Sequence, residues 1–431
     1  MRRLLRATFL VVVREEELVD RLIERVAGLD VHKATVKACV RVPSDQPGTR
    51  HSETRTFRTT TTGLVLLRDW LAGFQVTVVG MESTGVYWKP VYYLLEEEFE
   101  CWLLNAQHLR HVPGRKTDVA DAAWIAQLVE HGLVRPSFVP PRPIRELREL
   151  TRYRKALIHE RTREVQRLHK LLEDAGIKLG CVASDVLGVS GRLMLEALVG
   201  GTTDPEVLAE LARGQLRKKL PALREALQGR VARHQRLLVA ELLAHLDYLD
   251  EAVERLSGEV ARVVAPFSPL LALLMTIPGV DRRTAEVILA EIGTDMARFP
   301  TAGHLASWAG LCPGNNESAG KHFSGKTRKG SKWLRTALVQ AANAAARSKG
   351  TYLAAHYARI KGRRGHQKAI VAVAHSILVI AWHLLTRNQP YTDLGADYFL
   401  ERQHSEAYKN RLVRQLERMN YKVTLEPARV A

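Results

Sequence analysis

Two short apolar runs, each ending in a carboxylate, constrain this chain more than any other feature. Residues 26–29 are followed by Asp30, and residues 76–81 are followed by Glu82. Runs of this length, rich in β-branched residues, predict buried strands. Because an unpaired carboxylate is costly to bury, an acid at the end of such a strand is expected to meet a cation.

Two further acids open an Ala-rich run with helical spacing. Asp118 and Asp121 are three residues apart, so both face the same side of the predicted helix. A structural alternative is that Asp118 is the N-cap and Asp121 adds favourable charge to the first turn. Together with Asp30 and Glu82, the pair instead indicates a site with four oxygen ligands. Such a site suits Mg²⁺ or Mn²⁺ better than zinc.

The order of predicted elements indicates an α/β layer in the first third of the chain. We expect strands at 26–31, 35–42, 53–58, 76–81 and 101–104, and helices at 63–73, 85–98 and from Asp118 onward. Three strands followed by alternating helices and strands predict a mixed sheet. Four prolines in residues 136–143 then predict a linker and a domain boundary.

The rest of the chain is predicted to be helical. Residues 144–175 form a basic amphipathic pattern, and residues 231–264 carry apolar residues at alternating steps of four and three, which is a heptad seam. The seam could pack on the first helix as a hairpin or form a dimer contact. The Gly- and Pro-broken stretch 180–230 predicts short helices, and to these we assign no chemistry.

Two later segments have local signatures of their own. The Pro-Gly turn at 277–280, between short helices, resembles a helix-hairpin-helix, in which turn amides can face a phosphate. The apolar run 369–385 contains histidines and is too short to span a bilayer, so it predicts a buried helix and no membrane partner.

The charge of the chain is concentrated in its C-terminal half. The formal net charge is +18, which favours a polyanionic partner such as DNA or RNA. Residues 313–335 carry six Lys or Arg against one acid, together with glycines that allow close backbone approach. The predicted nucleic-acid-binding residues are Lys321, Lys326, Arg328, Lys329, Lys332, Arg335, Arg363 and Arg364.

Cysteine usage and the N-terminus predict a reducing, cytoplasmic location. Cys39, Cys101, Cys181 and Cys312 have no C-x-x-C spacing, so we expect free thiols. Residues 1–23 begin like a signal peptide, but their apolar part is short and an acidic stretch follows it without a cleavage site. We expect this leader to lie outside the fold.

Five segments, taken in order, resemble the DEDD transposases of insertion sequences, the IS-one-ten family of bridge-RNA-guided serine recombinases. They are Gly28–Lys33, Met81–Trp88, Lys116–Ala122, Ile277–Val280 and Ser318–Lys321. The resemblance extends over roughly residues 24–390, and the ordered set is more specific than any single motif.

The resemblance implies a RuvC-like (RNase H-like) domain at 24–140, a coiled-coil arm at 141–265, a mostly helical transposase domain at 266–390 and a tail at 391–431. It also implies that Asp30, Glu82, Asp118 and Asp121 bind Mg²⁺ or Mn²⁺ and that Ser318 is the nucleophile, with Ser324 and Ser331 as alternatives in the same loop. The implied partners are donor and target DNA, a guide RNA and further copies of the chain, near the bacterial nucleoid.

Other functional classes fit less of the sequence. A metal-dependent nuclease of the Holliday-junction resolvase class would use the four acids and water, with no role for the serine. DEDD exonucleases carry a Glu two residues after the first Asp, whereas here Val31 and His32 follow Asp30. A non-enzymatic nucleic-acid-binding protein would leave the four acids unexplained.

Overall fold

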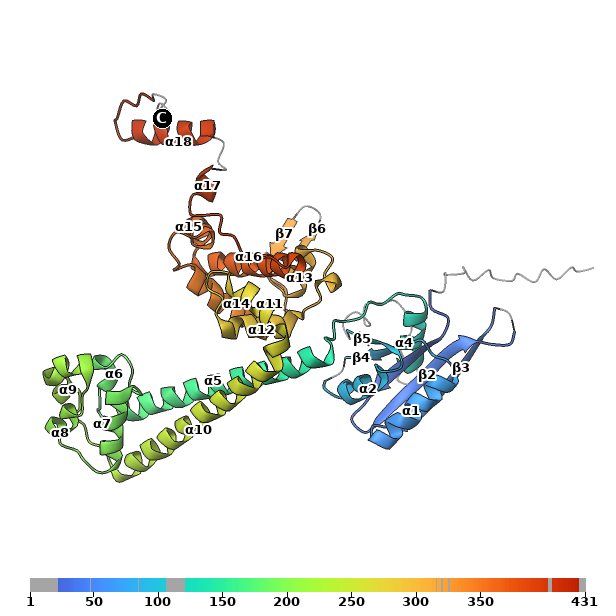
Figure 1. Cartoon of the computed structure of the whole chain (residues 1–431), viewed down its shortest axis with the longest axis horizontal. Coiled ribbons are helices and arrows are strands. Elements are labelled where there is room, and N and C mark those ends of the chain that lie inside the picture. Colours follow the sequence, from blue (N-terminus) through green and yellow to red (C-terminus); the bar gives the residue numbers. More distant parts are fainter. Residues whose placement is uncertain are drawn as a thin grey trace, which may run out of the picture. The chain divides into compact units, whose positions relative to one another are not determined.

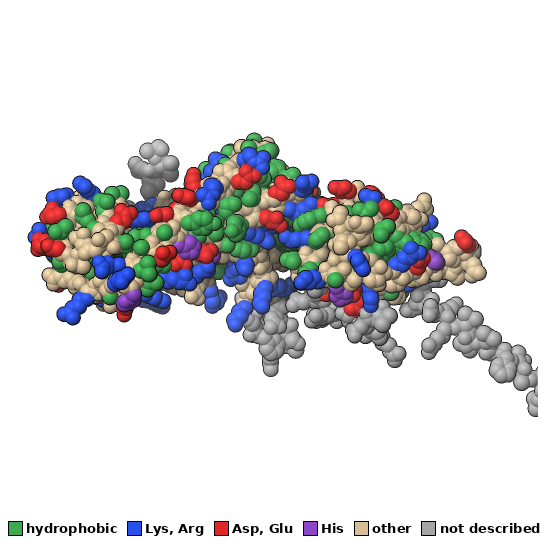
Figure 2. Space-filling model, turned by 90° about the horizontal axis from the view of Figure 1, so that it is seen from below, with side chains coloured by type: hydrophobic (Ala, Val, Ile, Leu, Met, Phe, Trp, Pro, Cys, Tyr) green, Lys and Arg blue, Asp and Glu red, His purple; other side chains and the backbone are tan. Residues whose placement is uncertain are grey.

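The computed structural model describes residues 22–105 except 47 and 84, residues 121–401 except 315, 319–320 and 325, and residues 405–425. For 316–318, 321–324, 400–401, 405–408 and 411 it describes the backbone alone. Asp118 and most of the predicted leader lie outside these ranges. The chain divides into two units between Val139 and Pro140 (Figure 1). Lys and Arg side chains are exposed over much of the face in Figure 2, in keeping with the high net charge.

The first unit is built on a five-stranded mixed sheet, which confirms the predicted α/β layer. Its strands are β1 (Val26–Val31), β2 (Thr35–Pro43), β3 (Arg50–Arg58), β4 (Val78–Glu82) and β5 (Glu100–Leu104), in the spatial order β3-β2-β1-β4-β5. The pairs β1–β2 and β2–β3 are antiparallel, whereas β1–β4 and β4–β5 are parallel.

Helices cover both faces of this sheet. On one face, α1 (Thr61–Gly73) and α2 (Trp88–Leu95) bury leucines against Ala27 and Leu29. On the other face, α4 (Asp121–Glu130) packs on Val26 and Val78. Side chains alternate between faces along a strand, so β1 contributes to both cores.

Several predicted boundaries were wrong by a few residues. Strand β3 begins at Arg50 because the whole edge strand pairs with β2 as far as Pro43. Helix α2 spans residues 88–95, because the chain turns at both ends of the predicted 85–98 helix. Pro143 lies in the first turn of the next helix, a position where the absent N–H costs nothing.

The second unit is almost entirely helical, as predicted. Its helices are α5 (Arg142–Asp174), α6 (Leu179–Val182), α7 (Val189–Val199), α8 (Pro205–Glu210), α9 (Leu220–Ala226), α10 (Arg233–Val264), α11 (Ser268–Met275), α12 (Arg282–Ile292), α13 (Ala302–Trp308), α14 (Lys332–Ala345), α15 (Tyr352–Arg364), α16 (His366–Arg387), α17 (Tyr398–Glu401) and α18 (Ser405–Glu417). Short 3₁₀ turns lie at Gly214–Lys219, Ala265–Phe267 and Met296–Arg298, and a hairpin joins β6 (Asn316–Ser318) to β7 (Lys321–Ser324).

Helices α5 and α10 form a long antiparallel hairpin, here called the arm (Figure 1). Leu157 of α5 is buried with Leu249 and Val253 of α10. Arg161 donates a hydrogen bond to Asp250 across the same interface at 3.0 Å. Much of the heptad seam is therefore buried inside this chain, which is the intramolecular alternative that the sequence left open.

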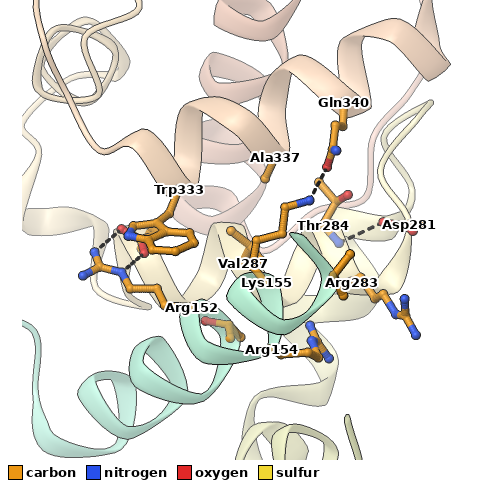
Figure 3. Close-up of a pocket in the computed structure, with 13 residues that line it drawn as sticks. Arg152, Arg154, Lys155, Asp281, Arg283, Thr284, Val287, Trp333, Ala337 and Gln340 are labelled. Atoms are coloured by element: carbon orange, nitrogen blue, oxygen red, sulfur yellow. Dashed lines mark hydrogen bonds and ion pairs between the residues drawn. The ribbon is translucent and has the colours of Figure 1, made fainter. Parts of the chain in front are cut away.

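The base of the arm is fixed to α12 by arginines. Arg148 donates to the carbonyl oxygens of Ala290 and Glu291 at 2.9 and 2.7 Å, where α12 ends. Arg152 forms two hydrogen bonds with the Glu291 carboxylate, at 2.7 and 2.8 Å (Figure 3). Arg154 meets Glu286 at 2.7 Å with both side chains buried, a pair that is costly to break because one charge would remain unpaired.

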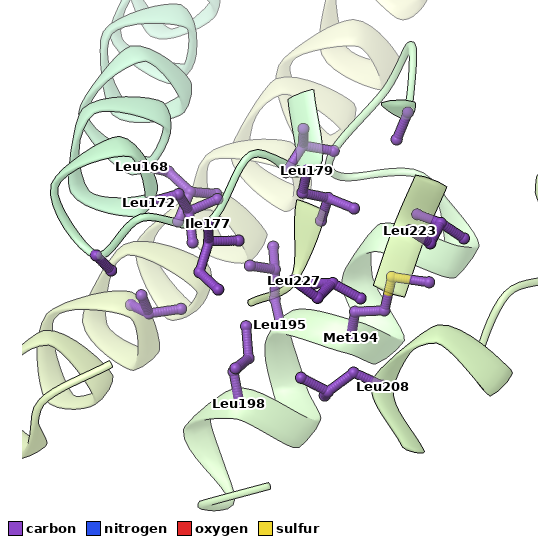
Figure 4. Close-up of a cluster of buried hydrophobic side chains, with 14 of the residues drawn as sticks. Leu168, Leu172, Ile177, Leu179, Met194, Leu195, Leu198, Leu208, Leu223 and Leu227 are labelled. Carbon is purple, nitrogen blue, oxygen red and sulfur yellow. The ribbon is translucent and has the colours of Figure 1, made fainter. Parts of the chain in front are cut away.

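The tip of the arm has its own hydrophobic core. Helices α6 to α9 surround a cluster that includes Met194, Leu195, Leu198 and Leu208 (Figure 4). The arm helices close this cluster with Leu168. The short helices that Gly and Pro signals predicted thus fold into one small helical body.

Two sequence signatures of the C-terminal body have structural roles. The Pro-Gly turn joins α11 to α12, and a Cβ at Gly279 would lie 2.4 Å from the carbonyl oxygen of Ala341. This turn therefore packs on α14 through Gly279. That its amides face a phosphate stays a prediction. Helix α16 is long and apolar enough to cross a membrane by composition, but Val373, Ile377 and Leu378 are buried in the protein core, which confirms a buried helix.

Candidate functional site

The first candidate site lies where two neighbouring parallel strands end. Leu29 of β1 pairs with Met81 of β4, so Asp30 and Glu82 are the next residues on adjacent strands. Side chains at matching positions of parallel strands point to the same face. The sheet register therefore brings these two predicted acids side by side.

Helix α4 adds a third acid at the same end of this face. A Cβ at Gly28 would lie 2.1 Å from the carbonyl oxygen of Ala122, so the first turn of α4 rests directly on β1. Gly28 is two residues before Asp30 and hence on the same face. Asp121 opens α4 next to this contact. We call Asp30, Glu82 and Asp121 the acid edge.

The far end of α4 is held by a buried carboxylate that sequence reasoning missed. Glu130 is fully buried, and its two oxygens meet the Nε atoms of Arg41 at 2.6 Å and Arg50 at 2.7 Å. These arginines lie on the neighbouring strands β2 and β3, so the ion pairs join the end of α4 to that side of the sheet. Buried carboxylates are retained where they are paired, and this one fixes the position of α4 along β1.

The donor chemistry of the acid edge suits a hard divalent cation, because all three groups are carboxylates. Asp30 accepts a hydrogen bond from His32 Nε2 at 3.0 Å, and its side chain is 18% exposed. In the part of the chain that the structure describes, no three His, Cys, Asp or Glu side chains are arranged to share one ion. The fourth predicted ligand, Asp118, lies outside that part.

The predicted serine lies on the β6–β7 hairpin. Ser318 is the last residue of β6 and pairs with Lys321 at the start of β7. The base of the hairpin is closed by the Gly314 amide, which donates to the Lys326 carbonyl at 2.9 Å. The side chains of Ser318, Ser324 and Lys321 lie outside the description.

Ser331, the third serine of this region, caps α14. Its hydroxyl accepts from the Leu334 amide at 3.3 Å and donates to Glu291 at 2.9 Å. The first interaction is that of an N-cap, and the second joins the start of α14 to α12, so the Ser331 hydroxyl has a structural role.

Most of the predicted cationic residues line one groove, which we call the basic groove. It has a volume of about 1450 Å³ and lies between the loop that follows the hairpin and helices α15 and α16. The cations that line it are Lys326, Arg328, Lys329, Lys332, Arg335, Arg364 and Lys368. None of its described lining residues is an acid. Arg363 is exposed on α15 but does not line the groove.

The opposite wall of the basic groove was not predicted. His356 and His375 line it together with Ile360 and Val371. Burial lowers the pKa of both histidines below the ordinary value, and Arg359 lowers that of His356 further. Lys368 and His375 are seven residues apart on α16, a spacing that places them on one helix face and could have identified this wall.

Comparisons with known proteins fit this arrangement. A DEDD transposase family of IS110 type matches residues 27–177, and the transposase IS116/IS110/IS902 family matches residues 271–358. The transposase for insertion sequence element IS1111A of Coxiella burnetii is 28% identical over 74% of this chain and 81% of its own length. The transposase for IS1328 of Yersinia enterocolitica is 25% identical over 76% and 89%. A pilin gene-inverting protein of Moraxella bovis is 34% identical over 28% and 38%.

Proposed function

The chain belongs to the IS110 family of insertion-sequence transposases, and on that premise we propose that it cleaves and rejoins DNA with a serine nucleophile and a divalent-metal site, guided by an RNA from its element. The observation that carries the proposal is the acid edge. Asp30 and Glu82 lie at matching ends of adjacent strands, on the face that α4 covers.

The acid edge, completed by Asp118, would hold Mg²⁺ or Mn²⁺. A bound ion of this kind supplies Lewis-acid stabilisation of negative charge on a phosphate. Two observations support this role: the sheet register places Asp30 beside Glu82, and the close contact between Gly28 and α4 brings the first turn of that helix to the same face.

Ser318 is the proposed nucleophile. Its oxygen forms a bond to phosphorus while one P–O bond of the DNA breaks, and attack by a DNA hydroxyl on this phosphoserine then rejoins a strand without ATP. The engaged hydroxyl of Ser331 supports Ser318 over Ser331. The hairpin that carries Ser318 adjoins the basic groove at Lys326.

The basic groove is proposed to hold nucleic acid through its phosphates, because its described lining residues include several Lys and Arg and no acid. Exchange between two duplexes requires at least two serines, so we propose that the active form is a homo-oligomer in the cytoplasm near the nucleoid. The name of the pilin gene-inverting relative agrees with a recombination reaction.

The experiment is to trap the covalent intermediate. With Mg²⁺, element RNA and labelled DNA, we expect an adduct on Ser318 that Ser318→Ala abolishes while binding of DNA and RNA remains. Ser331→Ala is the matched control and should retain the adduct. Cleavage that persists in the Ser318, Ser324 and Ser331 single alanine variants would replace this mechanism with a resolvase-like nuclease using activated water.

A further inference from the structure

A second cavity, apart from the basic groove, lies between helices α5, α12 and α14 (Figure 3). Its volume is about 200 Å³. An engineered protein cavity of about 150 Å³ accepts one benzene molecule. This cavity therefore suits a single flat heteroaromatic ring system and is too small for a base pair.

One side of the cavity is apolar and carries a flat aromatic surface. The Trp333 ring lines it together with Val287 and Ala337. Trp333 lies at the start of α14, and its ring points toward the space between the three helices (Figure 3). Aromatic walls of this kind hold unstacked bases in nucleic-acid-binding proteins.

The other side is polar and cationic. Lys155 Nζ donates to the Gln340 side-chain oxygen at 3.2 Å, which leaves the Gln340 amide NH₂ to donate to a guest. Neither Lys155 nor Arg283 forms an ion pair with a described residue. Burial lowers the pKa of Lys155, so this ammonium is partly desolvated. The cavity thus combines hydrogen-bonding groups with two unpaired cations. Its two lining carboxylates have partners of their own, because Glu291 pairs with Arg152 and Asp281 accepts from the Thr284 amide.

The cavity and the basic groove each have a lining residue in the first turn of α14. Lys332 lines the groove, and its ammonium lies 5.0 Å from the centroid of the Trp333 ring, which lines the cavity. A strand whose phosphates contact Lys332 would therefore have the mouth of the cavity within reach of its bases.

We propose that this cavity accepts one unpaired nucleobase of a strand bound in the basic groove. The inference rests on the proposed nucleic-acid binding of that groove and adds a site for a single extrahelical nucleotide. The base contacts the Trp333 wall, and Gln340 hydrogen-bonds to its edge. A lone phosphate would use Lys155 and Arg283 but not the aromatic wall, and an apolar guest would leave both cations without a partner.

The experiment measures binding of the full chain to hairpins that carry a one-nucleotide bulge, either with adenine or abasic, in DNA and RNA versions. We expect the adenine bulge to bind about tenfold more tightly than the abasic bulge. Trp333→Leu should bring this ratio close to one, whereas Trp333→Phe should keep part of it. Trp308→Leu, a change of the same kind outside the cavity, should leave the ratio intact. Circular dichroism establishes that each variant is folded.

The outcomes separate this inference from the proposed function. Equal affinity for the two bulges, with tight and salt-sensitive binding, would overturn the nucleobase site and leave the groove in place. An unchanged ratio in folded Trp333→Leu would also overturn it. If no hairpin binds at all, the nucleic-acid role of the groove fails first and the cavity proposal falls with it. A ratio seen only with RNA or only with DNA identifies the source of the base.

Discussion

The acid edge and the basic groove are positioned by different parts of the polypeptide. Asp30 and Glu82 are placed by backbone register between adjacent strands, and α4 lies so close that only glycine fits at position 28. The groove instead has one wall from the loop at 326–330 and another from helix α16, and most of its cations are exposed side chains on long stems.

Because of this difference, we expect the acid edge to be more sensitive to single substitutions than the basic groove. A site placed by backbone register tolerates little alteration of the backbone, and each of its carboxylates has a fixed place. A groove lined by many exposed cations distributes its binding energy, so the loss of any single cation has a small effect.

The largest expected effect is on catalysis at the acid edge. Asp30→Asn keeps the size of the side chain but removes the charge of a proposed metal ligand, which should cost several kcal/mol of transition-state stabilisation, or about a thousandfold in the strand-cleavage rate. Asp69→Asn, on the α1 face of the sheet, is the control and should cleave normally. Similar rates for both variants in a cleavage assay would remove Asp30 from the active site.

The next effect is on stability. Gly28→Ala would place a Cβ against backbone atoms of α4 that cannot rotate away, so we expect the free energy of unfolding to fall by about 3 kcal/mol. Gly80→Ala should cost less, because its closest neighbour is the Val129 side chain. Gly73→Ala, with no atom within 4 Å of the new Cβ, should be neutral. Equal unfolding midpoints for all three would show that α4 is not held by backbone contact.

A smaller effect is expected in the groove. The double variant Arg328→Ala, Lys329→Ala should lower the slope of log affinity against log salt by about two, with sequence preference unchanged. The pair Arg255→Ala, Arg262→Ala removes the same charge from exposed positions on the arm. If both pairs change the slope equally, net charge rather than the groove governs binding.

The smallest effect is on the pH dependence of binding. His356 and His375 have lowered pKa values in the folded protein, so they are neutral at pH 7 and gain charge only as the pH falls below about 6.5. Nearby phosphates favour the charged form, so affinity should rise by about fivefold or less as the pH falls.

The lowered pKa values of these histidines affect the stability of the free protein in the opposite direction: a fall in pH should strengthen binding but destabilise the fold. The unfolded chain protonates His356 and His375 more readily than the folded protein does, so stability that is present above pH 6.5 is lost as the pH falls. Melting temperatures must therefore be measured at each pH beside the affinities. The double variant His356→Gln, His375→Gln should bind with little pH dependence. The control His234→Gln, on the exposed side of α10, should behave as the unmodified protein does.

The acid edge could be predicted largely from sequence, because an apolar run that stops at an acid indicates both a strand and its end. Asp30 and Glu82 needed only the parallel pairing of their strands to come together. Glu130 could not be identified in this way, since its two arginine partners are distant in sequence and a helical Glu is usually exposed.

Only one wall of the basic groove was predicted from the sequence. The clustered cations of residues 326–335 indicated phosphate contact. For the opposite wall, the spacing of Lys368 and His375 indicates only that they share a helix face, and where that face lies depends on how α16 packs against α15. For the same reason the cavity beside Trp333 was missed. Its residues come from three helices, and Lys155 and Gln340 meet only through tertiary packing.

Helices α6 to α9 at the tip of the arm have their own core and form an insertion between the two arm helices, here called the cassette. The chain leaves α5 at Ala175 and returns beside it, since the Arg230 amide donates to the Ala175 carbonyl at 2.9 Å and the Lys178 amide donates to Ala226 at 2.7 Å. The two ends of the tip are therefore close enough for a short turn to join them. Shortening or grafting of this cassette would leave the arm helices continuous, at the cost of exposing Leu168 and Leu243.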